Sequence, residues 1–191
     1  MSASRRPGGR SERVRRAVLS ATAEEVLAHG LEGLSVTAIA RRAQVHHTTI
    51  YRRWPDISAL LLETAIEITR ARMPAPDLGA LRADLAAYFG ALIQLLSDGR
   101  VVAVVRSLLA TSEPALEELR HRYWQERFGV VETIIARAVA RGELPQETEP
   151  WRLIELIAGP IWMRTLLTGL PCDAELLARA IDDALRALVA L

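Results

Sequence analysis

The chain has 191 residues, half of them hydrophobic but only 5% aromatic, and its supply of Ala, Leu, Val and Ile is typical of helices packed on helices and excludes collagen-like and disordered chains. Cys172 is the only cysteine, which excludes an internal disulfide, and no apolar run reaches the roughly 20 residues of a membrane-spanning helix, so we expect a cytoplasmic protein with no membrane partner. The charges are unevenly placed: residues 1–55 hold ten Arg and four Glu, a net charge of +6, whereas residues 56–191 hold fourteen Arg and nineteen acids, a net charge of −5.

The basic N-terminal part favours contact with nucleic acid, because neutralised phosphates supply most of the non-specific affinity of DNA-binding proteins. The first ten residues, MSASRRPGGR, are small, polar and basic, and they predict a flexible arm over 1–10. From Glu12, apolar side chains such as Val14 and Val18 recur every four positions until Gly30, a residue type that commonly stops helices. This segment is the first predicted helix.

Residues 34–54 do not fit a single helix, because the apolar pattern breaks near Gln44 and His46 and then restarts. Two short helices are predicted instead, over 36–42 and over 47–53.

Local signals define these two helices. Ser35 is suited to cap the first one. The second helix is expected to bury Ile50 and Trp54 and to leave on its outer side His47, Thr48, Tyr51 and Arg52.

A longer connecting helix is expected over 57–73, opened by Pro55 and Asp56. The later helices are predicted over 77–96, 101–110, 113–140, 150–168 and 173–191, with Gly99, Gly142 and Gly169 as stops and Ser112, Thr148 and Asp173 as caps. The predicted fold class is all-α with about nine helices: a three-helix N-terminal domain over 11–55, then the connecting helix and a helical bundle over 56–191.

Two short helices joined by a tight turn can place the second in the major groove of DNA while the first crosses the backbone. The segment 34–60 that forms them here reads LSVTAIARRAQVHHTTIYRRWPDISAL. It resembles the DNA-binding domain of the TetR family, whose pattern is a Thr or Ser cap, Ile-Ala, Ala-Gly-Val-Ser, Leu/Ile-Tyr and an aromatic residue. The matching positions are Ser35, Ile39 and Ala40, Ala43 to His46, Ile50 and Tyr51, and Trp54, with Gly30 at the family's glycine after the first helix.

The resemblance implies a sequence-specific transcriptional regulator. The more common outcome in the family is a repressor that a small-molecule ligand releases from its operator, and an activator is the alternative. The C-terminal part is similar to the family's all-helical domains for ligand binding and dimerisation in length and helix count. The positions that face base edges in the family are occupied here by His47, Thr48 and Tyr51. The expected contacts to the DNA backbone come from Thr37, Thr49, Arg52 and Arg53, extended by Arg10 and Arg13.

The chain departs from the family pattern at four places, one of them Ala38, which removes the acidic half of a capping box. Gln44 stands where the family prefers Gly, so the turn either avoids a positive φ or holds a non-glycine residue there at some strain. His46 replaces the usual Ser cap of the recognition helix. Ile57 replaces a common phosphate-contacting Lys, which gives more weight to the arginines of the recognition helix and of the arm.

The bundle is expected to sense a largely apolar small molecule, because it contains most of the large side chains of the protein. Packing in an ordinary core is the alternative for each of them. Pro160, after Gly159, is expected to kink its helix and to open space beside Trp162. The candidate pocket residues are Tyr88, Phe89, Leu92, Val105, Tyr123, Trp124, Phe128, Trp162 and Met163.

The last two helices have wide apolar stripes, and in the TetR family the equivalent pair forms a four-helix interface between two protomers. A homodimer is also expected because two recognition helices read successive major-groove faces of a near-palindromic, double-stranded operator. The candidate interface residues are Leu153, Ile157, Ile161, Leu177, Ile181, Leu185 and Leu188.

Two other function classes were weighed. An enzyme is disfavoured because the sequence has no nucleophile elbow, phosphate-binding Gly-rich loop, zinc-binding HExxH or paired-Cys motif. His46 and His47 do not suggest a metal site, since adjacent helical residues point about 100° apart, and no cofactor is expected. A helical adaptor that binds proteins rather than DNA is the remaining alternative, and salt dependence of nucleic-acid binding distinguishes it from a DNA reader.

Overall fold

The structure is a computed structural model that describes residues 9–110 and 114–189. Within these ranges it contains nine α-helices, one π-helical turn and no strand, which confirms the predicted fold class. The elements are α1 (Gly9–His29), α2 (Val36–Arg42), α3 (His47–Arg53), α4 (Ile57–Arg72), α5 (Leu81–Leu96), α6 (Gly99–Ala110), α7 (Pro114–Ala140), α8 (Pro150–Met163), the π-helix η1 (Arg164–Thr168) and α9 (Ala174–Val189).

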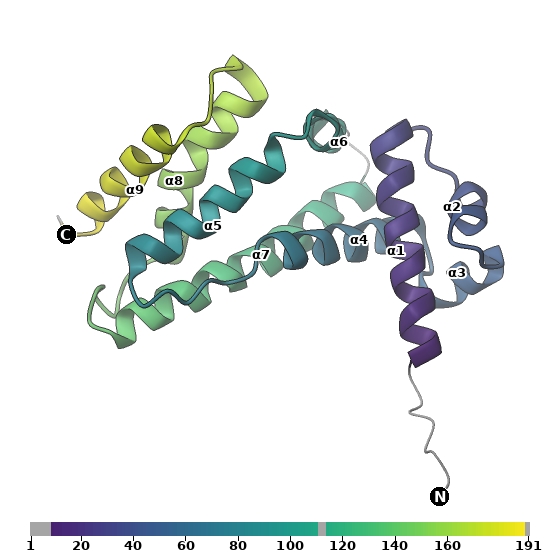
Figure 1. Ribbon diagram of the computed structural model, residues 1–191, viewed down its shortest axis with the longest axis horizontal. Coiled ribbons are helices and arrows are strands. Elements are labelled where there is room, and N and C mark those ends of the chain that lie inside the picture. Colours follow the sequence, from purple (N-terminus) through teal and green to yellow (C-terminus); the bar gives the residue numbers. More distant parts are fainter. Residues whose placement is uncertain (1–8, 111–113, 190–191) are drawn as a thin grey trace, which may run out of the picture.

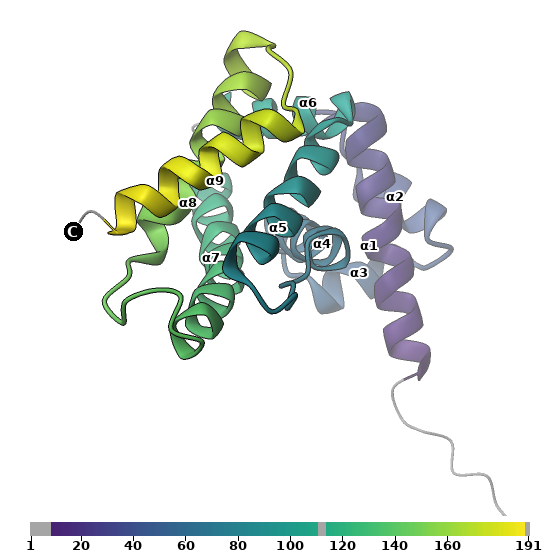
Figure 2. The same cartoon turned by 60° about the vertical axis from the view of Figure 1, so that its left-hand side comes forward.

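The helices form two parts that are joined through α4 (Figure 1). α1, α2 and α3 lie together at one end, and α4 leads from them and packs along α7. α5, α8 and α9 pack at the other end, where α8 and α9 lie side by side (Figure 2). Because α4 packs on both α1 and α7, any shift of α4 changes how the two parts are placed relative to each other.

The helix-turn-helix pair has the bounds that the sequence predicts. Ser35 caps α2, since its Oγ accepts the backbone N–H of Ala38 at 3.4 Å. Gln44 lies in the turn at φ 54°, in the left-handed region that favours glycine. Of the two possibilities left open by the sequence, the chain therefore uses a strained non-glycine residue.

A small hydrophobic core holds α1, α2, α3 and the start of α4 together. Its best-buried side chains are at most 3% exposed and include Val18, Ile39, Ile50, Trp54 and Leu60. Burial of one such aliphatic side chain contributes about 1.5–3 kcal/mol. Ile50 and Trp54 therefore fix which side of α3 faces outward, as predicted.

The larger core lies between α5, α7, α8 and α9. It encloses five of the residues expected at a dimer interface, none more than 8% exposed: Leu153, Ile157, Ile161, Leu177 and Ile181. The apolar stripes of α8 and α9 are thus packed within one chain, and any pairing surface needs other faces of these helices. Leu185 is half-buried against the same core, and the side chain of Leu188 lies outside the described residues.

Several helix ends differ from the prediction, and at the start of α5 the reason is a cap that comes from a distant residue. α5 begins at Leu81, four residues later than expected, since Glu143 accepts the N–H of Leu81 at 2.7 Å and buried Asp84 accepts that of Leu78 at 2.6 Å. Gly99 does not end α5 but begins α6. α1 begins at Gly9, within the segment expected to be a flexible arm, and the predicted cap Ser112 lies outside the described residues.

The segment predicted as one helix over 150–168 divides in two. α8 ends at Met163, and the chain continues as the π-helix η1 until Gly169, whose φ of 69° ends it. Pro160 lies inside α8 and has no N–H to donate, so one hydrogen bond of the helix is missing shortly before the π-helical turn.

Two predicted caps have different outcomes. Thr148 does not cap α8: its hydroxyl bonds the Pro145 carbonyl, and Glu149 occupies the cap position without a side-chain bond. Asp173 does cap α9, since its Oδ1 accepts the N–H of Leu176 at 2.8 Å.

Among the described residues, no single helix is both long and apolar enough to cross a bilayer, and the one helix pair that reaches that length together, Leu81–Leu96 with Gly99–Arg106, is bent by 87° at the break.

Candidate nucleic-acid interface and ligand cavity

The outer side of α3 presents the three residues expected to read bases. His47, Thr48 and Tyr51 are all exposed, and the Tyr51 side chain keeps 54% of its surface open. The rings of His47 and Tyr51 meet edge-on with their centroids 6.5 Å apart. The helix therefore displays a ring pair with hydrogen-bonding edges next to a threonine, on a surface that a major groove can accept.

His46 caps the recognition helix in place of the family's serine. Its Nδ1 lies 2.9 Å from the Thr48 hydroxyl and 3.5 Å from the Thr48 N–H. The imidazole thus engages the Thr48 hydroxyl, which leaves the Thr48 methyl group as the part available for a thymine methyl.

The expected DNA-backbone residues surround this helix. Thr37, Arg13, Arg52 and Arg53 are exposed and Thr49 is half-buried, whereas the side chain of Arg10 lies outside the described residues. The Arg53 guanidinium lies over the Trp54 ring, 5.4 Å from its centroid, and 3.9 Å from Glu63. Stacking and a nearby carboxylate hold Arg53 more firmly than a free surface arginine.

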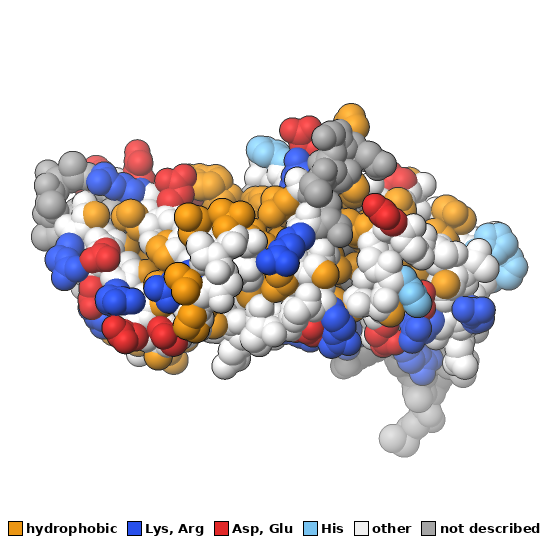
Figure 3. All heavy atoms as spheres, turned by 90° about the horizontal axis from the view of Figure 1, so that it is seen from above, with side chains coloured by type: hydrophobic (Ala, Val, Ile, Leu, Met, Phe, Trp, Pro, Cys, Tyr) orange, Lys and Arg blue, Asp and Glu red, His pale blue; other side chains and the backbone are white. Residues whose placement is uncertain are grey.

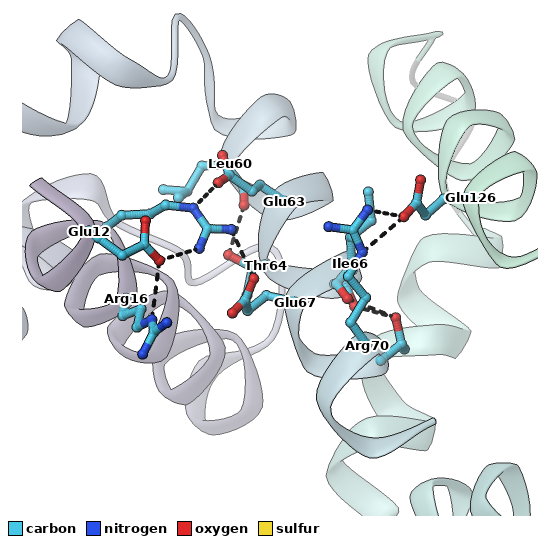
Figure 4. A network of polar contacts seen from close by, with 12 residues as sticks. Glu12, Arg16, Leu60, Glu63, Thr64, Ile66, Glu67, Arg70 and Glu126 are labelled. Atoms are coloured by element: carbon cyan, nitrogen blue, oxygen red, sulfur yellow. Dashed lines mark hydrogen bonds and ion pairs between the residues drawn. The ribbon is translucent and has the colours of Figure 1, made fainter. Parts of the chain in front are cut away.

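Two other arginines of the N-terminal part are engaged inside the domain. Arg15 bonds Glu12, Glu63 and Glu67, which links α1 to α4. Figure 4 shows Glu63 and Glu67 of α4 on the side that faces Glu12 of α1. The hydrogen bond to Glu67 raises the pKa of Arg15 further above its ordinary value, so the cation is permanent. Arg42 of α2 bonds Glu25 and Glu24 of α1 at 2.7 and 2.9 Å. These two charges hold the domain together and are not free for phosphates.

Glu63 of α4 connects the recognition helix to the connecting helix. Its Oε2 accepts the indole N–H of Trp54 at 2.6 Å, and its Oε1 accepts the Arg15 guanidinium. Trp54 is the residue that follows α3. The end of the recognition helix is therefore tied by a charge-assisted hydrogen bond to the first half of α4.

A cavity of about 620 Å³ lies between α1, α4, α5, α6, α7 and α8. Eight of the nine predicted pocket residues line it: Tyr88, Phe89, Leu92, Val105, Tyr123, Trp124, Phe128 and Trp162. Met163 does not, and its side chain is 53% exposed. The volume is in the range of cavities that hold drug-sized ligands.

Sequence reasoning missed one whole wall of this cavity. α1 contributes Leu19, Val26 and Leu27, and α4 contributes Leu61 and Ile68. Their periodic spacing was visible, but the pattern gives no means to tell a side chain that faces a cavity from one that faces a core. Arg127 was missed as well, since it is one of four arginines in α7 and nothing in the sequence distinguishes it from solvent-facing charges.

No group of three His, Cys, Asp or Glu side chains that could hold a metal ion occurs in the described ranges.

Comparison with known proteins identifies the family of this helix-turn-helix and its helical body. The family model for the tetracyclin repressor-like C-terminal domain matches residues 75–184, and the model for bacterial regulatory proteins of the tetR family matches residues 18–64. The chain belongs to the TetR family. It is a helix-turn-helix transcriptional regulator, as the sequence resemblance implies.

Full-length relatives agree with the family models. The regulator is 31% identical over 169 residues to the transcriptional regulator YdeS of Bacillus subtilis, covering 87% of this chain and 85% of YdeS. It is 30% identical over 166 residues to AqdR of Rhodococcus erythropolis, covering 85% of this chain and 80% of AqdR. It is 30% identical over 181 residues to the repressor TetR of Mycobacteroides abscessus, covering 92% and 94%.

Solved structures show the same fold. The TetR-family regulator SCO0332 superposes with a TM-score of 0.78 at 25% identity, covering 91% of this chain and 97% of that one. A protein described as the flavonoid-responsive regulator FrrA superposes with a TM-score of 0.66 at 20% identity, covering 94% and 96%.

Proposed function

We propose that this regulator binds a near-palindromic operator as a homodimer, represses transcription there, and leaves the operator when a largely apolar small molecule fills the cavity. One observation supports this most strongly: the cavity is lined both by the body helices and by α1 and α4, which hold the helix-turn-helix. A ligand in it contacts the two parts at once.

The DNA end of the proposal rests on the outer side of α3. His47, Thr48 and Tyr51 are exposed while Ile50 and Trp54 are buried beneath them. This arrangement offers base-reading groups on a helix whose orientation is fixed by its own core. Arg13, Thr37, Thr49, Arg52 and Arg53 are the proposed phosphate contacts, extended by Arg10.

The ligand end rests on α4. Leu61, Ala65 and Ile68 of this helix line the cavity, while Glu63 holds Trp54 at the end of α3. A ligand that displaces α4 therefore displaces the recognition helix. To change the operator-competent population from 99:1 to 1:99, the ligand must prefer the non-binding state by about 5.5 kcal/mol.

The homodimer rests on the family and on operator geometry, with a pairing surface different from the buried stripes. Hydrophobic side chains gather on the face of the molecule over α8 and η1 (Figure 3). Met163 and Leu167 are 53% and 76% exposed there. Large apolar side chains exposed together commonly mark a protein interface, and we assign this surface, with the outer side of α9, to the second copy.

Selection of genomic DNA fragments by the purified protein, followed by sequencing, tests the proposal. We expect a symmetric motif whose half-sites lie about 10–10.5 base pairs apart or a multiple of that spacing. Gel shifts on the selected site should show log affinity falling with log salt at a slope of about −0.9 per phosphate neutralised. Binding without sequence preference, or affinity independent of salt, would refute the proposal and favour an adaptor.

A further inference from the structure

Arg127 of α7 is the least expected side chain of the cavity. It is 4% exposed and lines a cavity whose other walls are mostly apolar. Its Nη2 donates to the Met73 carbonyl at 3.0 Å and to the Tyr88 hydroxyl at 2.8 Å. Its Nη1 is buried and has no hydrogen-bond partner among the described residues.

Arg127 bonds neutral groups and lies over the Tyr88 ring, 5.5 Å from its centroid, and no carboxylate of the described residues pairs with it. A carbonyl and a phenol are neutral acceptors, and burial raises the pKa of the Tyr88 phenol, which keeps it protonated at neutral pH. Burial raises the pKa of Tyr123 as well. Glu126, one residue before Arg127, bonds Arg70 instead. An unpaired cation taken out of water is costly, and such groups are retained where an anion completes them.

The carboxylates that line the cavity are already paired with other arginines. Glu67 is held by Arg15 at 2.8 Å, and Glu24 by Arg42 at 2.9 Å. Glu24 belongs to α1, and Glu67 belongs to α4 but is bonded to an arginine of α1. The cavity therefore combines an apolar body, compensated acids and one buried donor without an acceptor.

We infer that the effector is an amphiphile with an apolar body and one carboxylate-type anionic group, which pairs with Arg127. This inference rests on the proposed function. Nη1 has no acceptor among the described residues, and a carboxylate oxygen can accept a charge-assisted hydrogen bond from it. A bidentate pairing would in addition use Nη2, whose two N–H groups are donated to Met73 and Tyr88 in the structure. Aromatic side chains of the cavity, Phe89, Trp124 and Trp162 among them, contact the body.

The same arginine offers a route from the ligand to DNA. Met73 is the residue that follows α4, and its carbonyl is one of the two acceptors of Nη2. An anion that draws the guanidinium toward the cavity competes with this bond. The C-terminal end of α4 is then released or shifted, whereas its N-terminal half carries Glu63 and the recognition helix.

Matched probe pairs test the inference: dodecanoate against dodecanamide, and naphthalene-2-carboxylate against naphthalene-2-carboxamide. Each pair has nearly the same shape and differs in charge. Calorimetric titration of the wild-type protein should show the acids binding roughly 10- to 100-fold more tightly than the amides, the range expected for one charged hydrogen-bonding pair. Equal affinity of acid and amide, or no binding of either acid, would overturn the inference.

Three variants locate the anion. Arg127→Met should lose the preference for the acids while Arg127→Lys, which keeps the charge, should retain part of it. Arg72→Met is the matched control, because Arg72 also lines the cavity but is exposed, and it should behave as wild type. If Arg72→Met abolishes the preference and Arg127→Lys and Arg127→Met do not, the anion sits at the mouth and our assignment is wrong.

The selected DNA separates this inference from the proposed function. A wild-type protein that binds its site but treats acids and amides alike retains the proposed function and refutes the anion. A wild-type protein that prefers the acids but binds no specific DNA refutes the proposed function and keeps the anion site.

Discussion

The indole of Trp54 donates a hydrogen bond of 2.6 Å to Glu63, and this contact joins the end of the recognition helix to the connecting helix. Glu63 also accepts a bond from Arg15 of α1 and lies 3.9 Å from Arg53. One carboxylate therefore receives three cationic or polar groups from the DNA-binding part. It connects α4, which lines the cavity through other residues, with the end of α3.

Trp54→Phe should weaken operator binding while an aromatic ring still fills most of the space in the small core. The substitution removes the indole N–H that bonds Glu63. Loss of a hydrogen bond to a charged group is expected to lower the free energy of unfolding by about 1–3 kcal/mol. Urea denaturation and gel shifts measure the two effects. Trp151→Phe is the control, because Trp151 is 52% exposed. Unchanged DNA affinity in Trp54→Phe would show that Glu63 does not set the position of α3.

His47→Ala and Tyr51→Ala should each relax the preference at particular base pairs, at a cost of about 1–3 kcal/mol for the preferred site. Arg53→Ala should instead weaken all sequences alike, because the contact proposed for Arg53 is with a phosphate. Binding to a library of single-base variants of the operator separates the two patterns. A His47→Ala protein with an unchanged base profile would remove His47 from the readout.

Gln44→Gly should stabilise the DNA-binding part, because Gln44 holds φ 54° and glycine reaches this region without a Cβ penalty. The expected gain is about 1 kcal/mol, the usual left-handed penalty less the entropy of a glycine in the unfolded chain. Thermal unfolding measures it. Gln94→Gly, at an exposed position inside α5, should lower stability by a similar amount. Destabilisation by both substitutions would show that Gln44 makes a contact that outweighs its strain.

Leu153→Ala and Leu167→Ala should separate the core of one chain from the surface between chains. Leu153 is fully buried, so its truncation should cost about 2–5 kcal/mol of stability whatever the protein concentration. Leu167 is 76% exposed, and its truncation should leave monomer stability nearly unchanged but raise the dimer dissociation constant. Analytical ultracentrifugation with denaturation checks both. If the Leu153→Ala dimer dissociates without unfolding, Leu153 belongs to the dimer interface after all.

Acid should loosen the start of α5. The hydrogen bond from the Leu81 N–H lowers the pKa of Glu143 below its ordinary value of 4.5, and the Arg141 guanidinium lowers it further. A carboxyl whose folded pKa is depressed stabilises the fold above the unfolded pKa, and this contribution is lost as the pH falls through the folded pKa. Glu143→Gln should therefore be less stable than wild type near neutral pH and show a smaller stability loss below pH 4.5. If the free energy of unfolding falls equally steeply with pH in both proteins, Glu143 does not have this role.

The helix-turn-helix was predictable to the residue because its signals are local. Ser35 caps α2, Ile50 and Trp54 define the buried side of α3, and Gly30 ends α1 at φ 71°. Each of these depends on neighbours within one or two helical turns. The same holds for Asp173, which caps α9, but not for Thr148, whose hydroxyl turns to a carbonyl behind it.

The start of α5 and the faces of α8 and α9 were not predictable in this way. Glu143 caps α5 from 62 positions away. A wide apolar stripe such as that with Leu153 and Ile181 requires burial, yet the pattern does not say whether its own chain or a second one buries it.

The sequence alone determined the all-helical class, the position of the recognition helix, the residues displayed on it and the family. These follow from periodicity, caps and side-chain chemistry at fixed spacing, which act over a few residues. Only the tertiary structure decided that α1 and α4 line the cavity, that the stripes of α8 and α9 pack inside one chain, and that Arg127 is buried with no carboxylate partner among the described residues. Such facts depend on which surfaces meet across the fold, because burial and unpaired charge are properties of an environment rather than of a segment.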